Sequence, residues 1–412
     1  MRDSTMRDAI LALDREILDI TPIQLISKAA VASNLEFFSS AISQAWPDEV
    51  DYYYAIKANP HPDILQKVIS AGYGFECGGI QEIQLALDNN VRFIVNGSGK
   101  SSSILEVTAA NNGVINVDSG DELDKLLSLN TLARIALRLK FVFTNEPANQ
   151  MDFYFPSTYD SVNAYLRNKR WGMSLDEIST ILTTGLPSRL TFEGIHIHLG
   201  KLGKTLASFE LVANDLARQV NQLSAISKQE IKTINLGGGW NNSNPNPDGS
   251  TSFDMPELMT AFIESFRSGL KLKEFPSLIF EPGQAIVGSA GCTITTVTST
   301  KFDPTSGIHW THVDASTMTT NPVANSLQGS SYAISNLTSS SNEVIKTSIV
   351  GAPCMGSPFA ASVELPIPRE GDLLAIWDTG AYSYGLQRDF NGYLGAQTLL
   401  LENLNNDIGE AQ

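Results

Sequence analysis

Short apolar runs alternate with amphipathic segments over most of the chain, from residue 30 to residue 285. The apolar runs have the length of buried β-strands, and helix-start signals lie between them. The expected strands are 51–56, 93–95, 113–117, 134–139, 190–197, 233–236 and 277–280. Strand-then-helix units repeated over roughly 250 residues favour an α/β fold closed as a (β/α)8 barrel, although an open doubly wound sheet fits the same pattern.

The pattern changes after Gly283. Strand-like runs at 287–300, 310–313, 345–350 and 373–377 are separated by turns and show few helix signals, which is typical of antiparallel β structure. We therefore expect a barrel domain formed by residues 30–285 and a β domain formed by residues 1–29 and 286–412. Polar stretches at 241–252 and 335–342 are typical of flexible loops.

Length, charge and cysteine content limit the possible functions. The chain has 412 residues, 42% of them hydrophobic, which suits a two-domain globular protein. Its net charge of −16 argues against a nucleic-acid backbone or an anionic membrane as partner. Because no signal-peptide or membrane-spanning pattern is present, we expect a cytoplasmic protein. The three cysteines and five histidines have no metal-binding spacing, so we expect no catalytic metal.

The most informative single residue is Lys57, in the run Tyr53–Pro60. It ends an apolar, aromatic strand, at the place where barrels position their chemistry. Hydrophobic neighbours would depress the pKa of such a lysine and suit it to forming a Schiff base with a carbonyl group. A strand-end lysine that only reaches toward solvent is the competing interpretation, and this run alone does not separate the two.

Three further motifs follow apolar strands, and each is ambiguous by itself. The run Gly194–Gly200 places His196 and His198 on one face, where a histidine either lies flat against a cofactor ring or belongs to the core. Three consecutive glycines, Gly237–Gly239, either surround a phosphate with backbone N–H groups or form an ordinary turn. Glu281 either keeps a pyridine nitrogen protonated or forms a salt bridge in a turn.

Two motifs end strands of the expected β domain. Cys354, in Gly351–Cys354, offers a thiol that can donate a proton. Tyr382, in Asp378–Tyr382, offers a hydroxyl that can bind a phosphate. Standing alone, the first would be interpreted as a buried cysteine and the second as an amphipathic tyrosine.

Taken in order, these motifs resemble the fold-type III pyridoxal-phosphate decarboxylases, the group of the ornithine, arginine and diaminopimelate decarboxylases. The motifs are Tyr-Ala-x-Lys-Ala-Asn, His-x-His-x-Gly, Gly-Gly-Gly, Glu-Pro-Gly, Gly-x-x-Cys and Asp-x-Gly-Ala-Tyr, and the resemblance runs from Thr21 to Gly392. It implies an alanine racemase-like barrel with a β domain, pyridoxal 5'-phosphate as cofactor, and a homodimer with its active sites at the interface.

The resemblance also implies a role for each motif residue. Lys57 would hold the cofactor as a Schiff base and later transfer protons, His198 would stack on the pyridine ring, and Glu281 would bond the ring nitrogen. Cys354 of the partner subunit would protonate the carbanion after carbon dioxide leaves. The full expected set of cofactor-binding residues is Lys57, Glu76, His198, Lys201, Gly237, Gly238, Gly239, Glu281, Gly283, Gln284 and Tyr382.

At three positions near the cofactor the chain departs from the family. Glu76 stands where the family usually has aspartate, Lys201 where it commonly has serine, and Gln284 where it commonly has arginine. The usual serine and arginine help to hold the phosphate. One hypothesis is that Lys201 supplies the positive charge that Gln284 lacks.

A further departure concerns the substrate. The family usually has an acidic residue directly after the cysteine, near the distal ammonium of a diamino acid, whereas Cys354–Pro358 contains no carboxylate. A neutral lining cannot compensate a desolvated ammonium. We therefore expect free ornithine, lysine and diaminopimelate to be poor substrates, and a masked or carrier-, peptide- or nucleotide-linked amino acid of specialised metabolism to be decarboxylated instead. The alternatives are a racemase, a decarboxylase of a free amino acid, and a non-catalytic regulatory homologue.

Overall fold

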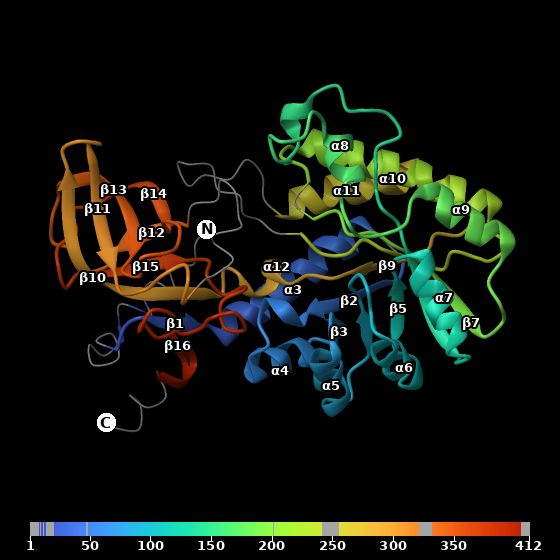
Figure 1. Cartoon of the computed structure of the whole chain (residues 1–412), viewed down its shortest axis with the longest axis horizontal. Coiled ribbons are helices and arrows are strands. Elements are labelled where there is room, and N and C mark those ends of the chain that lie inside the picture. The colour runs from blue at the N-terminus through green and yellow to red at the C-terminus, as the bar shows by residue number, and fades with distance from the viewer. Residues whose placement is uncertain are drawn as a thin grey trace.

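A computed structural model of the chain describes residues 8, 10, 12–13, 20–46, 48–200, 202–240, 255–320 and 332–404. Figure 1 shows a barrel surrounded by helices and, beside it, a separate body made mainly of strands. The long strand β10 leaves the barrel side and runs into the second body. The two parts therefore meet next to the end of the last barrel strand.

Eight parallel strands close the barrel in chain order, from β2 to β9, and β2 pairs with β9. The strands are β2 Val50–Ala55, β3 Gly74–Cys77, β4 Phe93–Val95, β5 Val114–Val117, β6 Ala133–Arg138, β7 Leu190–His196, β8 Thr233–Asn235 and β9 Ser277–Phe280. The helices are α3 Lys28–Ala45, α4 Pro62–Ser70, α5 Ile80–Asp88, α6 Ser102–Ala110, α7 Gly120–Ser128, α8 Val162–Arg167, α9 Leu175–Thr184, α10 Leu206–Ile226 and α11 Met255–Gly269. The expected (β/α)8 barrel is confirmed, and the open sheet is wrong.

The second body is a mostly antiparallel sheet, as expected. Its strands are β1 Ile23–Ile26, β10 Gly291–Asp303, β11 Ile308–Val313, β12 Ile334–Asn336, β13 Val344–Gly351, β14 Ala360–Pro366, β15 Leu373–Trp377 and β16 Gln397–Leu400. Two pairs, β1 with β16 and β11 with β13, are parallel. Because β1 pairs with β10, residues before the barrel belong to this sheet, but the exact domain limits stay a prediction.

Local details differ from the sequence expectations at three places. Strand β3 was not among the expected strands. The strand expected to begin at Val287 begins at Gly291, because Gln284–Val287 forms the short helix α12. The loop expected at 335–342 overlaps strand β12, whose Ile334 is buried. The loop expected at 241–252 lies outside the described residues.

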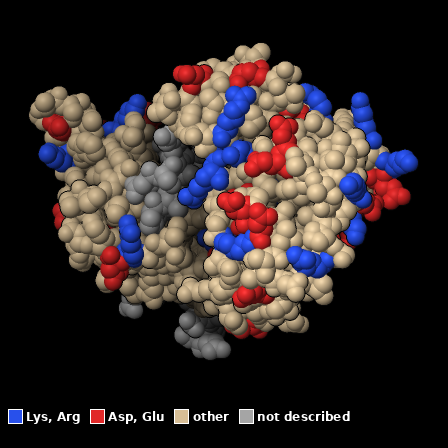
Figure 2. Space-filling view, turned by 45° about the vertical axis from the view of Figure 1, so that its right-hand side comes forward, with Lys and Arg blue, Asp and Glu red and all other residues tan. Residues whose placement is uncertain are grey.

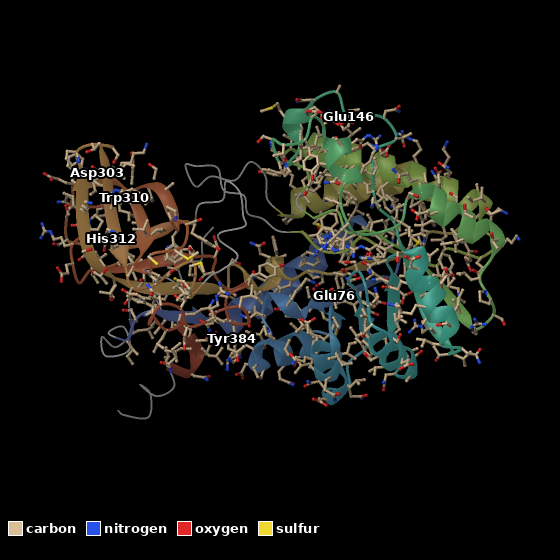
Figure 3. The ribbon with its side chains drawn as sticks, in the orientation of Figure 1. Glu76, Glu146, Asp303, Trp310, His312 and Tyr384 are labelled. Atoms are coloured by element: carbon tan, nitrogen blue, oxygen red, sulfur yellow. The ribbon has the colours of Figure 1, made fainter. Side chains whose placement is uncertain are left out.

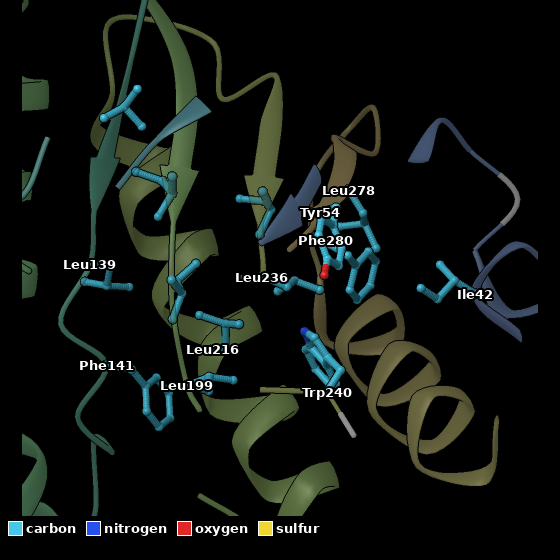
Figure 4. Close-up of a cluster of buried hydrophobic side chains, with 14 of the residues drawn as sticks. Ile42, Tyr54, Leu139, Phe141, Leu199, Leu216, Leu236, Trp240, Leu278 and Phe280 are labelled. Atoms are coloured by element: carbon cyan, nitrogen blue, oxygen red, sulfur yellow. The ribbon is translucent and has the colours of Figure 1, made fainter. Parts of the chain in front are cut away.

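An aromatic cluster inside the barrel wall supports the loop after β8. The Trp240 ring is buried, with its centroid 5.0 Å from that of Phe262 and 5.6 Å from that of Phe280, both edge-on (Figure 4). Its indole N–H donates a hydrogen bond of 2.9 Å to the carbonyl of Gly237. Packing of Trp240 in the core thus fixes the glycine turn for which the family resemblance implies phosphate binding.

Two features of the described part of the chain bear on partners. Within those residues, no helix is both long and apolar enough to cross a membrane, and no three His, Cys, Asp or Glu side chains are grouped as a metal site. On the face drawn in Figure 2, acidic and basic side chains are interspersed.

Candidate active site

Lys57 lies at the carboxyl end of β2, in a short 3-10 turn formed by Ile56–Ala58. Parallel pairing sets Ala55 opposite Glu76 on β3, so the two strand ends bring Lys57 and Glu76 together. The Lys57 amine donates a hydrogen bond to Oε2 of Glu76 and forms an ion pair with it. Burial alone would lower the pKa of Lys57, but Glu76, with smaller effects of Glu281 and Tyr382, raises the pKa above its ordinary value. The lysine side chain as a whole remains 48% exposed, although its amine contacts the buried Glu76.

Glu281 follows β9 and is 2% exposed. Asn235 Nδ2 donates to its Oε1 at 2.7 Å, and Asn96 Nδ2 donates to its Oε2 at 2.8 Å. Burial alone would raise the pKa of Glu281, but His196, with smaller effects of His198 and Lys57, lowers it below the ordinary value. The carboxylate is therefore held ionised and oriented inside the barrel, which suits it to bind a protonated ring nitrogen.

The two histidines of the seventh strand have different surroundings. His196 ends β7 and is fully buried, with Nε2 3.5 Å from Oε1 of Glu281. His198 lies beyond the strand and exposes part of its ring, although the protein surrounds it closely. Burial is the main cause that lowers the pKa of His198 to about 3. A neutral imidazole with an open face can stack on an aromatic ring.

The glycines after β8 make room that side chains would fill. Gly237 has φ +65°, and a Cβ there would lie 2.5 Å from the carbonyl oxygen of Ile197. At Gly238 a Cβ would lie 3.3 Å from Nε2 of His198. The turn is held from both ends, because Asn235 Oδ1 accepts from the Gly237 N–H at 2.9 Å and Trp240 donates to its carbonyl.

The Gly237→Ala substitution is expected to destabilise the protein by roughly 2–4 kcal/mol, because it combines a left-handed φ with a backbone clash. Urea unfolding of the cofactor-free protein measures this. Gly120→Ala is the matched control, since Gly120 begins α7 and a Cβ there meets nothing within 4 Å. That control should be neutral or slightly stabilising. Equal unfolding free energies for both variants would contradict the proposed tightness of the turn.

The β domain contributes Tyr382 to the same region. Its backbone N–H donates to the carbonyl of Ala58 at 2.7 Å, next to Lys57, and its φ of 58° is unusual for a side chain of this size. Burial raises the pKa of Tyr382, opposed by Lys57. A second contact between the parts joins His61 and Tyr384, whose ring centroids are 5.0 Å apart; Figure 3 labels Tyr384 on the β-domain side and Glu76 in the barrel.

Gly283 makes the approach of the loop after β9 possible. A Cβ there would lie 2.9 Å from the Cβ of Ala58. Gln284 is the first residue of α12 and lies beside this contact. Lys201 lies outside the described residues, so its proposed replacement of the usual phosphate ligands stays a hypothesis.

Within the described residues, the Cys354 side chain contacts Asn391 and no other expected site residue. It lies in the turn after β13, with an exposed thiol 3.9 Å from Nδ2 of Asn391. The other two cysteines, Cys77 and Cys292, are buried, and burial raises the pKa of both thiols. Cys354 is thus the exposed thiol of the chain.

Sequence reasoning missed the residues that orient the two carboxylates. Asn96 and Asn235 hold Glu281, and Asn116 donates to Oδ1 of Asn96 at 2.7 Å. Arg138, at the end of β6, is buried and lies 3.2 Å from Asp118. A signal was present, because each asparagine lies at the carboxyl end of an apolar strand or just beyond it.

These residues fit pyridoxal phosphate. The chain offers an amine at Lys57 for the aldehyde, an ionised carboxylate at Glu281 for the ring nitrogen, and a tight glycine turn for the phosphate. All three lie at the carboxyl ends of barrel strands β2, β8 and β9. That is the end of a barrel where active sites are built.

Comparisons with known proteins agree with this fit. Residues 34–288 match the model of the family described as pyridoxal-dependent decarboxylase, pyridoxal binding domain. The chain is 26% identical over 383 residues to the diaminopimelate decarboxylase of Archaeoglobus fulgidus, covering 90% of this chain and 85% of the relative. It is 26% identical over 393 residues to the probable chloroplastic diaminopimelate decarboxylase of Oryza sativa subsp. japonica, covering 94% and 75%.

A solved structure has the same fold. The diaminopimelate decarboxylase of M. jannaschii in complex with L-lysine superposes with a TM-score of 0.78 at 23% identity, covering 92% of this chain and 87% of the other. The fold, the glycine turn and the two strand-end carboxylates define a barrel enzyme built for a pyridoxal cofactor. The chain belongs to the pyridoxal-dependent decarboxylases. It is a carboxy-lyase, and its cofactor is pyridoxal phosphate.

These findings confirm the expected family, fold, cofactor and enzyme class. They do not support the expectation of a masked substrate, because the relatives named above are called diaminopimelate decarboxylases. The roles assigned to individual site residues stay predictions.

Proposed function

We propose that this enzyme removes the α-carboxyl group of a free amino acid, with Lys57 and Glu281 at the two ends of the cofactor. The observation that carries the proposal is the ion pair of Lys57 with Glu76 beside the oriented carboxylate of Glu281. The names of the curated relatives support a free amino acid such as diaminopimelate as the substrate class.

Bound pyridoxal phosphate supplies the electron sink that stabilises the carbanion left when carbon dioxide departs. Lys57 must lose a proton before its amine can attack an aldehyde, and Oε2 of Glu76 is the acceptor already hydrogen-bonded to it. Glu281 is held ionised and would favour a protonated ring nitrogen. His198, held neutral, would cover the ring without adding a competing charge.

Each active site is proposed to need two copies of the chain. Cys354 is exposed on the β domain, and within the described residues its side chain bonds Asn391 and not another expected site residue. In a symmetric dimer the same surface of each subunit faces the other, so both sites would be completed at once. Cys354 of the partner subunit would then protonate the α-carbon.

A second candidate substrate is an amino acid with a masked or conjugated side chain. The turn Cys354–Pro358 favours it, because Met355 follows the cysteine and is 58% exposed, and no carboxylate lies in the turn. An unpaired distal ammonium beside such a surface loses solvation without gaining a partner.

Carbon dioxide release tests both candidates. The holoenzyme is offered free lysine, ornithine, arginine, diaminopimelate and glutamate, and in parallel Nε-acetyl-lysine and a carrier-bound glutamyl thioester. We expect release from at least one free amino acid, at a rate at least about 10-fold above that of its masked form. Release from the masked compounds alone, with cofactor bound, would overturn the free-substrate proposal. Loss of chirality without release would indicate a racemase.

A further inference from the structure

One buried amide joins the two carboxylates of the site. Asn96 follows β4, and its Nδ2 donates both to Oε1 of Glu76, at 2.9 Å, and to Oε2 of Glu281, at 2.8 Å. Asn96 is 8% exposed, and the two glutamates are 2% exposed. A single NH2 group therefore supplies one hydrogen to each carboxylate in a place closed to bulk water.

The orientation of this amide is fixed from behind. Nδ2 of Asn116, on β5, donates to Oδ1 of Asn96 at 2.7 Å. The backbone carbonyl of Asn116 in turn accepts from the amine of Lys100 at 2.9 Å, and Lys100 pairs with Glu122 at 2.8 Å. Turning the Asn96 amide over would set its carbonyl against two carboxylates and its NH2 against another NH2, so only one orientation satisfies all partners.

The two hydrogen bonds from Asn96 counteract the repulsion between the neighbouring buried carboxylates of Glu76 and Glu281. Carboxylates this close tend to share one proton, which leaves one of them neutral. A donor to each favours the ionised form of both. The other charged or titratable groups that face the pair are Lys57, Cys77, Glu82, His196, His198 and Tyr382, and Arg138 lies behind the two histidines. Of these, Lys57 is the cation in direct contact with Glu76, and burial lowers the pKa of both histidines.

We propose that Asn96 is a positioning residue that holds the carboxylates of Glu76 and Glu281 apart and orients each with its own hydrogen bond. Proton exchange with Lys57 then occurs on Glu76, while Glu281 stays available for the ring nitrogen. The inference rests on the proposed roles of Lys57 and Glu281. Its consequence is that cofactor affinity, and not only turnover, depends on an amide that itself carries no charge.

The test measures the dissociation constant for pyridoxal phosphate by absorbance titration of cofactor-stripped protein. Asn96→Ala should weaken binding about 10-fold at every pH, because each carboxylate loses a donor. Asn96→Asp adds a third carboxylate and should weaken binding about 100-fold near pH 8. Near pH 6 the three carboxylates of the Asn96→Asp variant should take up a proton, and the protonated carboxyl group again donates a hydrogen bond. The ratio to wild type should then fall to about 10-fold.

Two further variants separate this effect from loss of structure. Asn163→Asp changes another buried asparagine, whose side chain bonds the backbone of Phe143 and no carboxylate among the described residues, and should leave the dissociation constant within about 2-fold of wild type. Asn116→Ala removes the hydrogen bond that orients the Asn96 amide but leaves both carboxylates unchanged. It should weaken cofactor binding about 3-fold. A pH-independent ratio for Asn96→Asp, or wild-type affinity for both Asn96 variants, would overturn the inference. None of these readouts requires a substrate, so they stand apart from the test of the proposed function.

Discussion

Lys57→Arg is expected to lower the rate of carbon dioxide release by about 1,000-fold or more, because a guanidinium cannot form the Schiff base that the amine forms. Arginine keeps the positive charge opposite Glu76, so the ion pair and the fold should survive. Borohydride reduction followed by mass spectrometry should find cofactor attached to the wild-type chain but not to the variant. Attachment at another lysine, with activity retained, would contradict the role of Lys57.

Mixing two inactive variants extends this result to the subunit arrangement. Lys57→Arg and Cys354→Ala homodimers each lack one residue in both sites. If Cys354 of the partner subunit completes the site, a mixed dimer has one intact site and one doubly altered site. Random exchange should therefore restore about a quarter of wild-type activity. No recovery, with subunit exchange shown by mass, would mean that Lys57 and Cys354 act within one chain.

Much of the barrel could be predicted because its strands are short apolar runs that end in turn residues. Strand β9, for example, was predicted at 277–280 and lies at Ser277–Phe280. Strand β3 was missed because Glu76 interrupts the short apolar run of Gly74–Cys77. The expected strand start at Val287 was wrong because a short apolar helix and an apolar strand have the same composition over four residues.

The site was only partly predictable because contacts between distant segments depend on strand register. Nothing in the sequence states that Ala55 pairs with Glu76, and this pairing is what brings Glu76 to Lys57. The asparagines were missed for a different reason. A neutral amide gives no charge signal, so Asn96 and Asn235 look like ordinary turn residues until Glu281 is placed between them.

Glu281→Gln is expected to lower the decarboxylation rate by about 100- to 1,000-fold, because a neutral amide does not favour a protonated ring nitrogen. The substitution changes little in volume, but it sets an NH2 group among the donors of Asn96 and Asn235. Steady-state rates of carbon dioxide release measure the loss. Glu36→Gln, which removes an exposed carboxylate on α3, is the control and should keep wild-type activity. A Glu281→Gln enzyme with wild-type rates would rule out the proposed contact with the ring nitrogen.

The pH dependence of folding gives a second, cofactor-free measure of the same carboxylate. Its surroundings lower the pKa of Glu281 below the ordinary 4.5, so the folded state binds the proton more weakly than the unfolded state. The resulting stabilisation is present above that value and is lost as the pH falls through the lower, folded-state pKa. Wild type should therefore exceed Glu281→Gln by roughly 2 kcal/mol in urea unfolding at neutral pH, and the difference should shrink below about pH 4.5. A difference that grows on acidification would mean that burial dominates and that the buried carboxyl group is neutral, which is incompatible with its proposed part in catalysis.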